Sequence, residues 1–221
     1  GQPGFMVRLA VYALLLLLPL VFSMSSYRVF AEAKRACLIV FAALLCFAER
    51  AYLLERIKSL KKNPADLFMA IFVAYLCLSV LWSPFTGSAF VAALVLFSWF
   101  FLYLVFKRNF TYEDDIHKMM FVLAISLFIN LVLGLLQLLG VYLPASLAGA
   151  EGPFGWVGNR NWYAIYIALM LPVEMWMVRR KKSPLRYGLG IANLVLGLPI
   201  LLLTWCRGAW VTFAATLAMW G

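Results

Sequence analysis

Charged residues are scarce in this chain, and acidic residues are the scarcest. Of 221 residues, nine are acidic and nineteen basic, so 13% are charged, while 66% are hydrophobic. Soluble globular proteins carry roughly 25% charged residues. This composition excludes a soluble domain, a disordered chain and a disulfide-rich scaffold. In so apolar a chain, a net charge of +10 indicates lysines and arginines that orient helices rather than nucleic-acid binding. The sequence predicts an all-α, polytopic membrane protein.

Residues that hold metals are also few. The chain has one histidine, His117, so a site of paired histidines is excluded. The four cysteines lie inside apolar runs and form no CxxC pair: Cys37, Cys46, Cys77 and Cys206. They are interpreted as small buried hydrophobic residues. The sequence therefore predicts no metal and no cofactor.

About eight apolar segments approach the length of a membrane span, which is about 20 residues. They are Phe5–Met24 with a kink at Pro19, Ala31–Leu54, Leu67–Leu81, Ala89–Phe106, Met119–Leu139, Asn161–Val178, Leu189–Thr204, and a segment that starts near Gly208. A turn signature at Trp82–Ser88 separates the third from the fourth, so these two are predicted to form a helical hairpin.

Basic residues divide unequally between the two alternating sets of loops. Fourteen of the nineteen lie on the side of the N-terminus, and five lie on the other: Arg28, Lys34, Arg35, Arg160 and Arg207. Lysine and arginine accumulate in cytoplasmic loops of membrane proteins. The N-terminus is therefore predicted to be cytoplasmic, with the Trp82 turn and the loop at Gly140–Gly158 outside.

Two of the five outward basic residues suggest an anion site on the outer face. Arg207 lies within an apolar run, where a cation is costly unless it faces a partner or a wet cavity. Arg160 lies where a loop becomes a helix, between Asn159 and Asn161. A helix start with arginines suits phosphate oxygens. The alternative stays open: Arg207 snorkels to the interface, Arg160 is an ordinary loop residue, and the asparagines are helix caps.

Other polar residues are predicted to have structural roles. His117 is expected in a solvated helix start, and Glu174 is expected to snorkel towards Arg179 or Arg180 near the inner interface. Three amides within spans are predicted to hydrogen-bond between helices: Asn130, Gln137 and Asn193. Four glycines are predicted to mark close helix contacts: Gly134, Gly188, Gly190 and Gly197.

Four segments, in order, resemble the O-antigen ligase/polymerase family of bacterial envelope glycan enzymes. They are LSVLWSP at 78–84, GLLQ at 134–137, GWVGNRNWYA at 155–164 and LTWCRGAW at 203–210. The last two resemble the family's glycine–asparagine–any–asparagine and serine–arginine–glycine elements. Cys206 stands where serine is usual and Arg160 where proline is common.

The resemblance implies a metal-independent glycosyltransferase of the bacterial inner membrane, of the kind used in lipopolysaccharide biosynthesis. It would move glycan from an undecaprenyl-diphosphate donor to an acceptor sugar hydroxyl on a glycolipid or glycan at the outer face. Arg207, Arg160, Asn159 and Asn161 would bind substrate. The alternative function is a small-anion, bicarbonate-type transporter, which would favour two similar halves and a charge at mid-depth; the sequence shows neither.

Residues 1–221 are predicted to form a single transmembrane helical domain within a larger bundle. The apolar run that ends at Gly221 is shorter than a span. We therefore expect the chain to stop before a large external loop, in which the resemblance implies a catalytic histidine. The catalytic residue is thus expected beyond residue 221, and the 221-residue portion is expected to be inactive by itself.

Overall fold

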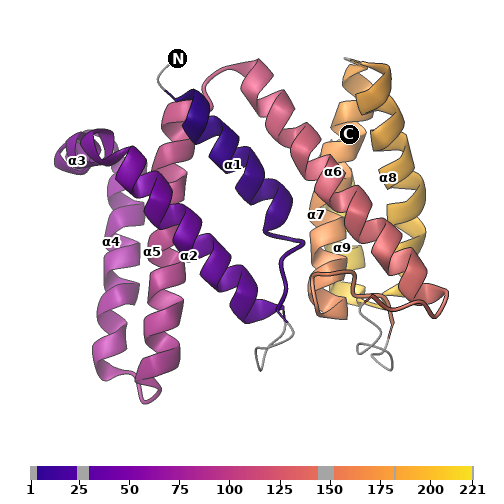
Figure 1. The fold of residues 1–221 in the computed structure, drawn as a ribbon, viewed down its shortest axis with the longest axis horizontal. Coiled ribbons are helices and arrows are strands. Elements are labelled where there is room, and N and C mark those ends of the chain that lie inside the picture. Colours follow the sequence, from indigo (N-terminus) through magenta and orange to yellow (C-terminus); the bar gives the residue numbers. More distant parts are fainter. Residues whose placement is uncertain (1–3, 24–29, 144–151, 182, 221) are drawn as a thin grey trace. The chain divides into compact units, whose positions relative to one another are not determined.

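All regular secondary structure in the described part of the chain is helical, which confirms the all-α prediction. The computed structural model describes residues 4–23, 30–143, 152–181 and 183–220. Its elements (Figure 1) are α1 (Phe5–Leu17), α2 (Ala31–Ala48), α3 (Arg50–Lys58), η1 (Leu60–Lys62), α4 (Pro64–Leu78), η2 (Ser79–Trp82), α5 (Thr86–Asn109), α6 (Glu113–Leu138), α7 (Arg160–Arg180), α8 (Pro184–Leu203) and α9 (Arg207–Trp220).

Four helical segments of the described chain are long and apolar enough to cross a membrane. They are α4 together with η2, then α5, α6 and α8, and the pair α2 and α3 makes a fifth if it is counted as one bent span. α7 does not reach the same hydropathy, because polar residues such as Asn161 and Glu174 lie among its apolar ones. Helices suit a bilayer because they satisfy their own backbone hydrogen bonds. The chain is compatible with a multi-pass membrane protein.

The first helix is shorter than the predicted span. α1 has 13 residues and ends at Leu17, and the backbone then turns, with Leu20 N donating to Leu17 O. Leu18 precedes Pro19, and a residue before proline is disfavoured in the helical region. Pro19 thus follows the end of the helix and does not kink it. Met24, the predicted end of this span, and Arg28 lie outside the described residues.

The second predicted span is bent. α2 ends at Ala48 and α3 follows at an angle of 83° to it, so the segment predicted over Ala31–Leu54 is one span only if this bent pair is counted as one. The residue at the bend is Glu49, which is buried and whose carboxylate pairs with Arg108 and accepts from Asn109 Nδ2. These tertiary partners hold the carboxylate at the bend.

The helical hairpin predicted around Trp82 is confirmed. α4 begins after Asn63, whose side chain accepts from the backbone N–H groups of Ala65 and Asp66. η2 continues α4 to Trp82, a short turn follows, and α5 returns along α4 (Figure 1).

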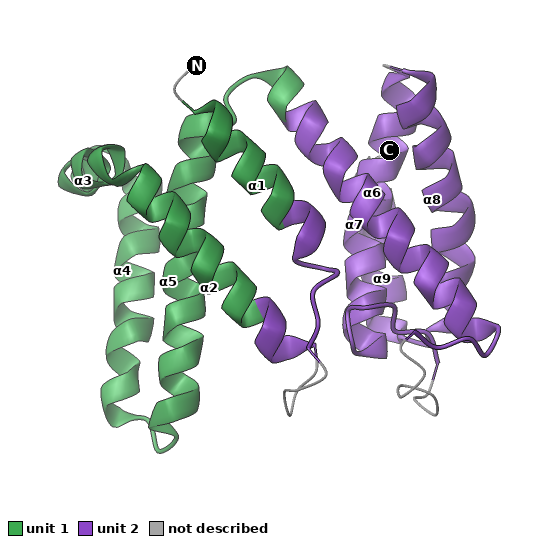
Figure 2. Cartoon of the chain, viewed as in Figure 1, with its two compact units in different colours: residues 1–14, 35–115 green, residues 15–34, 116–221 purple. Residues whose placement is uncertain are grey.

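The chain forms two compact units, shown in Figure 2. Unit 1 comprises residues 1–14 and 35–115, and unit 2 comprises residues 15–34 and 116–221. In unit 2, α7 packs against both α8 and α9. The core there includes apolar side chains of α6, α7 and α8: Leu127, Leu131, Ile167, Leu171 and Ile200. The single domain expected over residues 1–221 stays a prediction.

Three of the four glycines predicted to mark helix contacts do so. A Cβ at Gly134 would collide with the hydroxyl of Tyr163. One at Gly190 would lie 2.8 Å from Val178 Cγ2, and one at Gly197 would lie 2.9 Å from a side-chain carbon of α7. At Gly188 the prediction is wrong, because no atom lies within 4 Å of an added Cβ.

Candidate functional site

The start of α7 holds three of the four predicted site residues. Asn159 is the N-cap: its Oδ1 accepts from Asn161 N at 2.8 Å and from Trp162 N at 3.3 Å. The cap therefore occupies two of the backbone N–H groups that the anion hypothesis left free for a ligand. Arg160 is half-buried and its side chain runs beside Gly152. Any anion here would bind to side chains more than to the helix start.

Gln137, at the end of α6, holds the loop that leads into α7. Its Oε1 accepts from Phe154 N and from Gly155 N, each at 2.9 Å, and its Nε2 donates to Gly155 O at 3.1 Å. The side chain is buried, so these bonds fix the backbone of the loop. The sequence prediction of contact between helices is wrong for Gln137, because its partners belong to a loop.

Asn130 holds the same loop one residue further on. Its Oδ1 accepts from Trp156 N at 3.0 Å, and its backbone oxygen accepts from the hydroxyl of Tyr163 at 2.8 Å. Tyr163 belongs to the first turn of α7 and is fully buried, and Gly134 leaves the space for its hydroxyl. Asn130 and Gln137 are therefore positioning residues for the segment that carries Asn159 and Arg160.

Lys34 is a further residue of this loop that sequence reasoning did not single out. Its Nζ donates to Trp156 O and to Val21 O, each at 2.7 Å. One of the five outward basic residues thus links Val21 to the loop at Trp156 within unit 2. Its neighbours in the sequence, which include Glu32 and Arg35, gave no sign of these carbonyl partners.

The fourth predicted site residue, Arg207, begins α9. Helix α8 ends at Leu203. The backbone then passes through Trp205, whose φ is +55°, and the next helix starts at Arg207. Thr204 is fully buried and its hydroxyl donates to Leu201 O at 2.6 Å, while Trp210 Nε1 donates to the same oxygen at 2.9 Å. Arg207 itself is exposed. The arginine lies at a helix start and not in the middle of a continuous apolar helix.

The two candidate arginines lie at the same end of unit 2. α7 and α9 pack together and run in the same direction, so their first residues, Arg160 and Arg207, share one end of the unit (Figure 1). Neither has a hydrogen-bond or ion-pair partner among the described residues. The opposite end of the unit carries other basic residues: Lys118, Arg179, Arg180, Lys181 and Arg186.

Two residues outside this end are placed differently from the predictions. His117 was expected in a solvated helix start, but it is buried and stacks on Trp176 with ring centroids 4.5 Å apart. Glu174 was expected to snorkel towards Arg179 or Arg180, but it is fully buried between helices. Both errors have one cause: helix packing covers these side chains, and local sequence does not report that.

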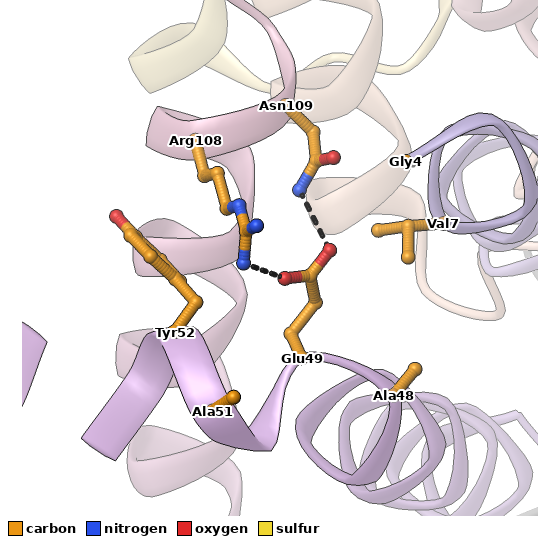
Figure 3. A pocket seen from close by; sticks show the side chains of 8 residues that line it. All are labelled: Gly4, Val7, Ala48, Glu49, Ala51, Tyr52, Arg108 and Asn109. Carbon is orange, nitrogen blue, oxygen red and sulfur yellow. Dashed lines mark hydrogen bonds and ion pairs between the residues drawn. The ribbon is translucent and has the colours of Figure 1, made fainter. Parts of the chain in front are cut away.

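Unit 1 contains a pocket of about 340 Å³, shown in Figure 3. Glu49, Arg108 and Asn109 supply its polar groups, and the Arg108 guanidinium also lies 4.5 Å from the ring centre of Tyr52. Because Glu49 and Arg108 pair with each other, the pocket offers little net charge to an ionic ligand. It is a weaker candidate for an anion site than the two arginines of unit 2, which have no partner in the part of the chain that the structure describes.

Comparisons with models of protein families, with curated proteins and with solved structures found no match for this chain. The assignment of Arg160, Arg207, Asn159 and Asn161 to substrate binding therefore rests on their chemistry and placement in unit 2.

Proposed function

We propose that this chain belongs to an inner-membrane glycosyltransferase of the O-antigen ligase type. The enzyme has eight membrane segments and a cytoplasmic N-terminus. It moves glycan from an undecaprenyl-diphosphate donor to an acceptor sugar hydroxyl at the outer face. The observation that carries the proposal is the pair Arg160 and Arg207, two cations at the starts of two packed helices with no ion-pair partner among the described residues.

The chemistry of transfer accounts for two arginines at one end of a helical unit. The acceptor hydroxyl attacks the anomeric carbon, the bond from that carbon to the diphosphate oxygen breaks, and the hydroxyl proton passes to a base. Negative charge grows on the departing diphosphate. Guanidinium groups are permanently charged and donate two parallel hydrogen bonds to phosphate oxygens, so Arg207 and Arg160 stabilise this leaving group.

The loop before α7 supports the same role. Gln137 and Asn130 hold its backbone by hydrogen bonds to residues 154–156. A backbone fixed in this way sets the position of Arg160. A cation whose position is already set loses less conformational entropy when a diphosphate binds. Asn161 is exposed beside it and offers an amide to the donor.

The test is glycan transfer in vesicles that contain the full-length protein and a labelled polyprenyl-diphosphate donor. Hydrogen bonds to charged partners contribute about 1.5–3 kcal/mol, so Arg207→Ala should lower the rate roughly ten- to hundredfold. Arg207→Lys keeps the charge and loses the second parallel bond, so its rate should lie between those of Ala and wild type.

A matched control is Arg179→Ala, which removes an exposed arginine from the opposite end of α7. It should transfer glycan at the wild-type rate. Wild-type transfer by correctly inserted Arg207→Ala would refute the site. Anion flux through the vesicles without any glycan transfer would instead indicate the transporter.

A further inference from the structure

Glu174 lies in the interior of unit 2 without a hydrogen-bond donor. Its exposed fraction is 0%, and neither carboxyl oxygen has a hydrogen-bond partner among the described residues. The residue faces α8 at Gly190, where an added Cβ would be 3.8 Å from Glu174 Oε2 and 3.3 Å from its backbone oxygen. Glycine at position 190 thus lets the two helices meet at the carboxyl group.

Asn193, one turn further along α8, supplies a second acceptor without a donor. Its side chain interacts with the carboxyl group of Glu174. Its Nδ2 donates to the backbone oxygen of Ala124 on α6 at 2.9 Å. That Oδ1 is buried and has no donor within the described chain. Asn193 Oδ1 and both carboxyl oxygens of Glu174 are therefore buried acceptors that no hydrogen-bond donor of the described chain reaches.

The titratable groups around the carboxyl do not neutralise it. Tyr166 on α7 lies nearby, and its hydroxyl is directed to a serine of α6 at 3.5 Å. The guanidinium carbon of Arg186 on α8 lies 5.3 Å from the ring centre of a phenylalanine of α6. His117 of α6 stacks on a tryptophan of α7. The charged residue of α9, Arg207, is at the other end of the unit. None forms an ion pair with Glu174.

We propose that Glu174 and Asn193 form a buried proton-binding site that joins α7 to α8. A proton taken from solvent by the carboxylate gives a neutral acid, and its O–H donates to Asn193 Oδ1. One proton thus supplies the missing donor to both groups and removes an unpaired buried charge, which the interior would otherwise have to solvate. Release of the proton requires water to reach the carboxylate, so it is coupled to the separation of α7 from α8. These helices lead from Arg160 to the turn before Arg207.

The test is infrared spectroscopy of the full-length protein in lipid at neutral pH. A protonated carboxyl group absorbs above the amide I band, whereas a carboxylate does not. The chain has nine acidic residues, so few carboxyl groups can contribute bands to this part of the spectrum. The expected spectrum contains one acid C=O band that shifts on transfer to deuterium oxide and is lost in Glu174→Gln. The glutamine amide can donate to Asn193 Oδ1, so this variant should fold.

A second variant tests the partner. Asn193→Leu removes the acceptor, so the acid band should remain and move to the higher frequency of a carboxyl group without that hydrogen bond. The control Glu55→Gln changes an exposed acidic residue and should leave the band unchanged. The proposal is overturned if wild type has no acid band, if the band survives in Glu174→Gln, or if sodium at constant pH abolishes it. The last result would identify a metal cation as the ligand.

Discussion

Gln137 provides the sharpest test of how the loop before α7 is held. Gln137→Leu keeps the size of the side chain and removes three hydrogen bonds to the backbone of Phe154 and Gly155. Each hydrogen bond contributes about 1 kcal/mol net, so the free energy of local opening should fall by about 3 kcal/mol. Because 1.4 kcal/mol is a factor of ten, the amides of these two residues should exchange roughly a hundredfold faster.

Hydrogen–deuterium exchange read by mass spectrometry measures this effect on the segment 152–163. The control is Leu138→Ala, which shortens a partly exposed side chain next along α6 and should leave the exchange of that segment unchanged. If Gln137→Leu exchanges at the wild-type rate, the loop is held by other contacts and the positioning role of Gln137 is wrong. Glycan transfer should be slower in Gln137→Leu, in which exchange is faster, since the loop carries Arg160.

Three other predictions concern packing, topology and a buried ion network. Gly190→Leu should overpack the α7–α8 contact and lower the free energy of unfolding by about 1–3 kcal/mol, while Gly188→Ala, which has open space, should not reduce the yield of folded protein. In a cysteine-free background, an impermeant thiol reagent on intact cells should label Ser88→Cys and not Ser183→Cys; labelling at 183 would reverse the predicted orientation. Asp66 is fully buried and accepts hydrogen bonds from Arg56, Lys107 and Tyr103. Asp66→Asn should destabilise the hairpin by roughly 2–4 kcal/mol in thermal unfolding, because it leaves partly buried cations unpaired. An unchanged midpoint of unfolding would refute this.

The sequence by itself determined the all-helical class of the protein and the positions of most helices. Apolar runs about as long as a bilayer is thick predict helices, because only internally bonded backbone is stable in lipid. The α4–α5 hairpin, α6 and α8 follow that rule closely. Local chemistry offered the Asn159 cap as the alternative to a ligand site, since an asparagine before an apolar run satisfies free N–H groups.

Tertiary structure alone decided which polar side chains meet and which are covered. The bend at Glu49 depends on Arg108, almost sixty residues away, and the loop before α7 depends on Gln137 and Asn130 of another helix. Glu174 was expected to reach solvent because local spacing describes depth along a helix and not which face a neighbouring helix covers. Packing sets that face, and packing depends on residues distant in the chain, so the burial of Glu174 became visible only in the folded unit.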